Sequence, residues 1–234
     1  MDNTTPEQDL KAALEASVAW WQDMGVTTAP VPSAPPTKKT AKEPAQKTLG
    51  KQRVISQPTQ APTRDDAQQE RNTKAQAQAK SAPTLEALKK ILEEFDAGAL
   101  SDHARQIVFA RGNPKADIMF IGEAPGREED KVGLPFVGPA GQLLDKMMAA
   151  IGLSEDNAYI TNVCNWRPPQ NRNPSEDELA MCAPFITRHI ELIAPKIIVI
   201  VGGVSLQALT GITGIMKTRG RWQELNIGGH IIPA

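Results

Sequence analysis

Cysteine is scarce in this chain of 234 residues, which contains only Cys164 and Cys182. Two thiols cannot by themselves complete the four-thiolate sites that hold structural zinc or iron–sulfur clusters. Long apolar runs are also lacking, and no apolar stretch near the N-terminus is typical of a secretory signal. We therefore expect a cytoplasmic protein that has no membrane partner.

The chain also has no large excess of positive or negative residues. The 26 Lys and Arg residues nearly balance the 27 Asp and Glu residues, which gives a net charge of −1. This balance excludes a uniformly basic surface, so any contact with nucleic acid must be a local patch. The strongest basic run of the folded part contains Lys217, Arg219 and Arg221. A solvated loop before a strand is an equally good interpretation of that run.

The composition divides the chain into three parts. Residues 1–25 show helical apolar spacing and predict a short amphipathic helix, through which a repair or replication partner would bind. Residues 26–82 are rich in Pro, Ala, Gln and Lys and have few large apolar side chains, which predicts a disordered linker. Residues 83–234 carry the pattern of a folded domain, which we expect to be monomeric.

Strand and helix patterns alternate along the folded part. Helices are predicted at residues 85–95, 141–151 and 175–192, the last with Ser175 and Glu178 as a capping box. Strands are predicted at residues 116–121, 158–163 and 196–201, the last expected to be buried on both faces. This alternation predicts a three-layer α/β/α sandwich with a mostly parallel central sheet.

Residues 122–141 form the most informative segment. They read GEAPGREEDKVGLPFVGPAG, with five glycines, three prolines and the adjacent acids Glu128, Glu129 and Asp130. The segment follows a predicted buried strand, and open α/β sheets bind ligands at the carboxyl ends of their strands. We therefore predict a loop that forms a functional site.

This segment resembles the first motif of the family 4 uracil-DNA glycosylases. The run ITNV at residues 160–163 and the run RPPQNRNP at residues 167–174 match the motifs that follow it. The resemblance implies hydrolysis of the N-glycosidic bond of uracil in DNA, within base excision repair. Uracil must leave the base stack before such chemistry can occur.

The resemblance also implies roles for individual residues. Phe136 would stack on the flipped base, and the Asn162 amide would bind its Watson–Crick edge. Glu129 is the first candidate for the catalytic carboxylate and Glu123 the second, whereas Glu128 and Asp130 are expected to be solvated loop charges. The residues proposed to seat uracil are Gly122, Ala124, Phe136 and Asn162. Those proposed to contact DNA phosphates are Arg167, Arg172, Arg219 and Arg221.

The sequence departs from the family pattern in its cysteines. The family carries four cysteines that hold a four-iron–four-sulfur cluster, but only Cys182 falls on a ligand position here. Cys164 comes two residues too early, and Trp166 occupies the ligand position itself. We therefore expect no cofactor, with Trp166 and its apolar surroundings filling the space and both cysteines acting as small buried hydrophobic residues.

The second departure from the family pattern concerns a histidine. The resemblance implies a catalytic His-Pro element after an Ile-Pro-Ala strand, and the sequence stops at Ala234. We expect a domain that lacks its C-terminal end and an activity that is impaired as a result. His103 and His189 have no motif around them and are expected at the surface.

Two other functions remain as alternatives. A non-catalytic protein would bind uracil-containing or single-stranded DNA in the same pocket without turnover. A nucleotide-binding or transferase domain would use a doubly wound sheet, but residues 122–126 lack the Gly-Lys-Ser/Thr of a phosphate loop.

Overall fold

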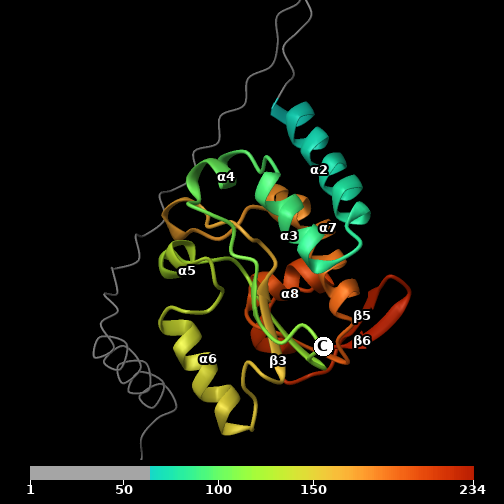
Figure 1. Cartoon of the computed structure of the whole chain (residues 1–234). Helices are drawn as coiled ribbons and strands as arrows, with labels where there is room; N and C mark the ends of the chain where they lie inside the picture. The colour runs from blue at the N-terminus through green and yellow to red at the C-terminus, as the bar shows by residue number, and fades with distance from the viewer. Residues whose placement is uncertain (1–63) are drawn as a thin grey trace, which may run out of the picture. The chain divides into compact units, whose positions relative to one another are not determined.

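The computed structural model describes residues 64–234, drawn in colour in Figure 1. The helix predicted over residues 1–25 and the linker up to residue 63 lie outside the described residues. No helix in the described range is long and apolar enough to cross a membrane.

A four-stranded sheet lies at the centre of the domain. Its strands are β1 (Ala110–Gly112), β2 (Ile118–Gly122), β3 (Ala158–Asn162) and β4 (Ile197–Ile200), in the order β1-β3-β2-β4. Strands β2, β3 and β4 are parallel, and β1 pairs antiparallel with β3. The predicted mostly parallel sheet is confirmed. Because β3 and β4 lie on opposite sides of β2, the sheet has a topological switch point at the carboxyl end of β2.

Helices cover both faces of this sheet. On one face, Leu144 and Met148 of α6 (Pro139–Ala150) share an apolar cluster with Phe120 and Ile160. On the other face, α7 (Glu176–Ile193) contributes apolar residues to the larger cluster, which also contains Met119 and Ile121. Alternate residues of β2 therefore face different helices, as strand geometry requires. These layers confirm the predicted α/β/α sandwich.

The remaining elements are short. They are α3 (Leu85–Glu94), α4 (Ala99–His103), α5 (Arg127–Val132), a 3-10 turn (Pro169–Asn171), α8 (Gly203–Thr210), α9 (Ile215–Thr218) and a hairpin of β5 (Glu224–Ile227) and β6 (His230–Pro233). The predicted capping box of α7 is confirmed. The Glu178 amide donates to Ser175 Oγ at 3.2 Å, and the Ser175 amide donates to Glu178 Oε2 at 2.8 Å.

The last part of the predicted linker is helical, so the prediction of disorder was wrong there. Residues Arg64–Ser81 form α2, which packs along α7 (Figure 1). Ala75, Ala79 and Ala82 are buried, and Arg188 Nε of α7 donates to the Ala82 carbonyl at 2.9 Å. Small alanines allow two helices to approach closely, and alanine is the best helix former. The prediction failed because it counted only large apolar side chains.

Strand β4 is less buried than predicted. It pairs only with β2 and forms an edge of the described sheet. Val199 is 37% exposed, whereas Ile198 on the opposite face is 1% exposed. The apolar run therefore predicted the strand and its parallel pairing, but the prediction of burial on both faces was wrong, because β4 lies at the edge of the sheet, where Val199 stays partly exposed.

His189 is buried, which corrects the prediction that it lies at the surface. It is 1% exposed, its ring stacks on Phe109 at a centroid distance of 4.4 Å, and a 2.8 Å hydrogen bond joins its Nε2 to the Tyr159 hydroxyl. Burial disfavours the charged imidazolium and lowers the pKa of His189 to about 3. His103, in contrast, is exposed as predicted.

This burial predicts a loss of stability in acid. The unfolded chain protonates His189 near its ordinary pKa of 6.5, whereas the folded chain resists protonation down to about 3. Stability contributed by this residue is therefore present above pH 6.5 and is lost as the pH falls towards 3. Between pH 7.5 and 4.5 the loss should be about 3 kcal/mol. Urea unfolding at both pH values should show a smaller loss in His189→Gln, and an equal loss in both proteins would contradict the assignment.

Candidate functional site

A pocket of about 640 Å³ opens at the switch point of the sheet. Strands β2 and β3 end side by side there, because Gly122 is paired with Asn162 in the parallel register. The lining residues come from the loop after β2, the end of β3, the turn before α7 and the residue after β4: Glu123, Ala124, Gly126, Arg127, Glu128, Glu129, Phe136, Gly138, Pro139, Ala140, Asn162, Asn171 and Val201. All four residues predicted to seat uracil therefore lie in or beside one pocket.

Gly122 allows two of these residues to meet. A Cβ atom at this position would lie 2.5 Å from Asn162 Oδ1 and 2.5 Å from Phe136 Cζ. Both distances are far inside van der Waals contact. The missing side chain therefore leaves the space in which the aromatic ring and the amide share the floor of the pocket.

Phe136 has a strained backbone. Its φ of 56° lies in the left-handed region, which is a clear outlier for a bulky residue. A Cβ atom on Gly141, in the first turn of α6, would lie 1.7 Å from the Phe136 carbonyl oxygen, so only glycine fits beneath it. Strain of this kind persists where the surrounding structure imposes it, and it is concentrated at functional sites.

Arg111 supports the same backbone from β1. Its Nη2 donates to the Phe136 carbonyl at 3.2 Å, and its guanidinium forms ion pairs with Asp145 and Glu155. The side chain is 8% exposed, and its Nε has no partner among the described residues. The role of Arg111 could not be predicted from the sequence, because its partners lie 25 to 44 positions away.

Asn162 presents its amide to the pocket. The residue is 3% exposed, and within the described residues its side chain has no hydrogen-bond partner. Its position is fixed by the β2–β3 ladder, and the next amide, of Val163, donates to the Gly122 carbonyl at 2.9 Å. A buried amide that offers one donor and one acceptor face is suited to the edge of a nucleobase.

The Glu129 carboxylate connects two parts of the loop by hydrogen bonds. Its Oε1 accepts hydrogen bonds from the amides of Val137 at 3.0 Å and Gly138 at 2.7 Å, and its Oε2 accepts from the Gly126 amide at 3.1 Å. The carboxylate therefore joins the N-terminal ends of α5 and α6. Helix α5 is itself a correction, since a continuous loop was predicted here. Its first turn is stabilised by the Glu129 carboxylate, which accepts a hydrogen bond from the amide of the N-cap residue, Gly126.

Glu123 is the carboxylate that remains free. It is half-buried in the pocket, and within the described part of the chain no hydrogen bond or ion pair satisfies its side chain. Burial raises the pKa of Glu123 above its ordinary value of 4.5. A partly desolvated carboxylate of this kind is common among catalytic groups.

The neighbouring acids differ from one another. Glu128 is exposed and pairs with Lys131 at 2.9 Å, as expected for a solvated charge. Asp130 is 1% exposed, so the prediction that it is solvated was wrong. Its Oδ1 accepts the Arg105 amide at 2.8 Å, and its Oδ2 lies 3.7 Å from Arg167 Nη1.

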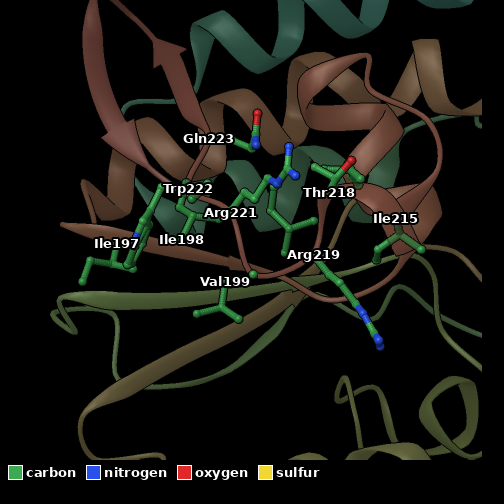
Figure 2. Close-up of a pocket in the computed structure, with 13 residues that line it drawn as sticks. Ile197, Ile198, Val199, Ile215, Thr218, Arg219, Arg221, Trp222 and Gln223 are labelled. Atoms are coloured by element: carbon green, nitrogen blue, oxygen red, sulfur yellow. The ribbon is translucent and has the colours of Figure 1, made fainter.

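None of the four predicted phosphate-binding arginines lines this pocket. Arg172 forms two 2.7 Å hydrogen bonds with the Glu178 carboxylate, and Arg167 is bound by Asp130 and Asn171. Arg219 and Arg221 are exposed beside a second cavity of about 410 Å³, along β4 (Figure 2). Their guanidinium groups point in different directions in this view. Neither has an ion-pair partner within residues 64–234.

The residues present do not fit the four-cysteine cluster that the resemblance implies. The chain has two cysteines, both are buried, and no group of three ligand side chains gathers within the described range. A hydrogen bond with Cys164 and burial raise the pKa of the Cys182 thiol, which keeps it protonated. Trp166, 3% exposed, packs against Phe95 at a centroid distance of 6.1 Å and against Phe185 at 6.4 Å. An aromatic cluster therefore occupies the surroundings of the single matching ligand position, Cys182.

Together these features define an α/β domain with an aromatic and amide pocket at the switch point of its sheet. The sequence pattern of the uracil DNA glycosylase superfamily matches residues 109–234, more than half of the chain. The chain belongs to this superfamily.

Several proteins described as type-4 uracil-DNA glycosylases are similar to it. That of Sulfurisphaera tokodaii is 45% identical over 146 residues, covering 58% of this chain and 66% of the relative. That of Saccharolobus solfataricus is 46% identical over 134 residues, covering 55% and 62%. That of Thermotoga maritima is 36% identical over 151 residues, covering 64% and 79%. The chain thus spans less than two thirds of the length of the first two relatives.

Proposed function

We propose that the protein is a uracil-DNA glycosylase, which hydrolyses the bond between uracil and deoxyribose in DNA and so begins base excision repair. The observation that carries this proposal is the absence of a side chain at Gly122. It leaves room for the Phe136 ring and the Asn162 amide to lie together at one pocket. Membership of the superfamily and the similarity to type-4 enzymes support it. Its substrate is uracil-containing DNA, and as an enzyme of genome repair it acts in the cytoplasm.

Base recognition is assigned to the floor of the pocket. We propose that uracil, turned out of the stack, lies against the Phe136 ring while the Asn162 amide binds its polar edge. Gly122 and Ala124 supply the open space and the backbone beside the base. The Asn162 side chain has no hydrogen-bond partner among residues 64–234, so its donor and acceptor groups are available to the base.

Hydrolysis requires a positioned water molecule and a group that stabilises the charge that develops on the sugar. The water oxygen bonds to C1′ of the sugar, the electron pair of the C1′–N1 bond leaves with uracil, and the proton released by the water neutralises the uracil anion. We propose that Glu123 orients this water and stabilises the positive charge that develops on the sugar. Glu129, whose two oxygens already accept three amide hydrogen bonds, acts by positioning the loop.

The raised pKa of Glu123 predicts a pH dependence. The ionised carboxylate is the active form, so excision should fall as the pH drops through a pKa above 4.5. In Glu123→Gln this acid limb should disappear and the single-turnover rate at pH 7.5 should fall by about 100-fold. Rate profiles between pH 4.5 and 8 test this. An unchanged acid limb in the variant would assign the titration to another group.

Uracil excision tests the function itself. A labelled single-stranded oligonucleotide with one deoxyuridine is incubated with the full chain, and abasic sites are revealed by alkaline cleavage. Cleavage at the uracil position, absent from a strand with thymidine there and lost in Asn162→Ala, is the expected result. Tighter retention of the uracil strand without cleavage would instead indicate a non-catalytic binding protein.

A further inference from the structure

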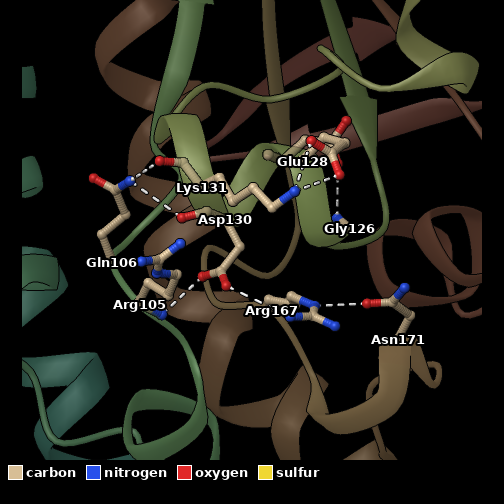
Figure 3. Close-up of polar contacts among 9 residues, drawn as sticks. Arg105, Gln106, Gly126, Glu128, Asp130, Lys131, Arg167 and Asn171 are labelled. Atoms are coloured by element: carbon tan, nitrogen blue, oxygen red, sulfur yellow. Dashed lines mark hydrogen bonds and ion pairs between the residues drawn. The ribbon is translucent and has the colours of Figure 1, made fainter.

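Asp130 begins a chain of polar contacts that runs from the protein interior to the pocket. Its carboxylate is buried, and it holds the Arg105 amide through Oδ1 and the Arg167 guanidinium through Oδ2 (Figure 3). The Arg167 side chain is itself only 16% exposed. Since the two charges compensate each other, this pair adds little to the field that a DNA strand would meet.

Arg167, held by Asp130, in turn binds the side chain of Asn171. Its Nε donates to Asn171 Oδ1 at 2.6 Å, so the guanidinium lies between a buried carboxylate and an amide (Figure 3). A side chain held on both sides is poorly placed to reach a phosphate. The contacts instead give Arg167 the geometry of a residue that positions its neighbour.

Asn171 is held in an unusual conformation at the rim of the pocket. Its φ is 54° and that of Gln170 is 58°, two successive left-handed residues without a glycine. Its amide N–H donates to the Pro168 carbonyl at 3.2 Å, and its side chain lines the same pocket as Phe136 and Asn162. The backbone and the Arg167 contact together fix where this amide lies.

The Arg167 contact also fixes which way the amide faces. Because Oδ1 accepts from Arg167, Nδ2 is left with two hydrogens to donate, and none of the described residues accepts them. Asn162 is nearly fully buried, whereas Asn171 is exposed. An exposed donor at the pocket mouth faces the sugar–phosphate backbone of a bound strand, and asparagine is a common donor to phosphate oxygens.

We propose that Asn171 donates a hydrogen bond from Nδ2 to a phosphate oxygen beside the extruded nucleotide, with Arg167 and Asp130 as positioning residues. This inference rests on the proposed glycosylase function, since it places the same DNA at the same pocket. It changes the role first expected of Arg167, from contact with a phosphate to orientation of the residue that makes that contact.

Binding measurements separate the two roles of Arg167. The probe is a fluorescent single-stranded oligonucleotide with one stable abasic-site analogue, titrated by anisotropy at several salt concentrations. Asn171→Ala should weaken binding by about fivefold, as expected for loss of one hydrogen bond. Arg167→Met should weaken it similarly without changing the salt slope, whereas loss of a phosphate-binding cation lowers that slope by about 0.7 on a single strand. In the Asn171→Ala background, Arg167→Met should have no further effect.

The neighbouring Arg172 provides the matched control. It lies in the same loop but is bound by Glu178, so Arg172→Met should combine additively with Asn171→Ala. Thermal melting checks folding, because Arg167→Met leaves the buried Asp130 without its charge partner. Asp130→Asn/Arg167→Met removes both charges and should bind as Arg167→Met does.

Three results would overturn the inference. They are wild-type affinity in Asn171→Ala, a reduced salt slope in Arg167→Met, and additivity of these two substitutions. Failure of the glycosylase proposal has a different signature. A wild-type chain that binds the strand with the expected pattern but releases no uracil would remove the proposed activity and leave the Asn171 contact in place.

Discussion

Replacing Gly122 by alanine should reduce the rate of uracil excision by at least about 100-fold. The added methyl group would lie 2.5 Å from both Phe136 Cζ and Asn162 Oδ1, so at least one of these groups must move. Displacement of a catalytic or binding group by about 1 Å can cost 100-fold in rate. Because the methyl group also occupies the floor of the pocket, the Michaelis constant should rise together with the fall in kcat.

A second glycine provides the control. Gly203, in the first turn of α8, has a backbone open to any residue, and a Cβ atom there would meet only Ile215, at 3.7 Å. Gly203→Ala should therefore excise uracil at the wild-type rate. Single-turnover assays of both variants check the prediction, and wild-type activity in Gly122→Ala would show that the base is bound elsewhere.

Removal of the Glu129 carboxylate should have the largest effect on stability. Glu129→Ala loses three hydrogen bonds between a charged acceptor and backbone amides. Bonds to charged groups contribute about 1.5–3 kcal/mol each, and water replaces part of this loss at a half-buried site. The free energy of unfolding should fall by about 3 kcal/mol. Excision should fall as well, because Val137 and Gly138 directly follow the strained Phe136.

The adjacent Glu128 offers a control of the same residue type. It is exposed and bound only to Lys131, and such surface pairs contribute 1 kcal/mol or less. Glu128→Ala should thus unfold in urea at nearly the wild-type midpoint and excise uracil normally. Equal stability of the Glu129→Ala and Glu128→Ala variants would contradict the structural role assigned to Glu129.

Much of the fold could be predicted from local sequence patterns. Apolar runs identified β2, β3 and β4, and the Ser175–Glu178 pair identified the start of α7. These signals act over a few residues, so they survive in the sequence. Helix α2 could not be predicted in this way, because its alanine stripe becomes informative only when α7 is beside it.

Some residues of the pocket could be predicted from the sequence, but the geometry of the pocket could not. The sequence motifs predicted that Phe136 and Asn162 contact the base, and the structure places both residues at one pocket. The motifs could not distinguish the three adjacent acids, because their environments depend on distant residues. Asp130 is buried through contacts with Arg105 and Arg167, which lie 25 and 37 positions away. Asn171 was part of a quoted motif, yet its position at the pocket follows from a turn that only the structure shows.

The Asn162 side-chain amide offers the most direct test of the central claim, that this pocket receives uracil. Free uracil would be titrated into the ¹⁵N-labelled chain while the side-chain NH2 signals are followed by NMR. The Asn162 signal is assigned by its absence from Asn162→Ala. We expect a saturable shift of this signal and much weaker binding by the variant. Uracil that leaves the Asn162 signal unmoved, or that binds both proteins equally, would contradict it.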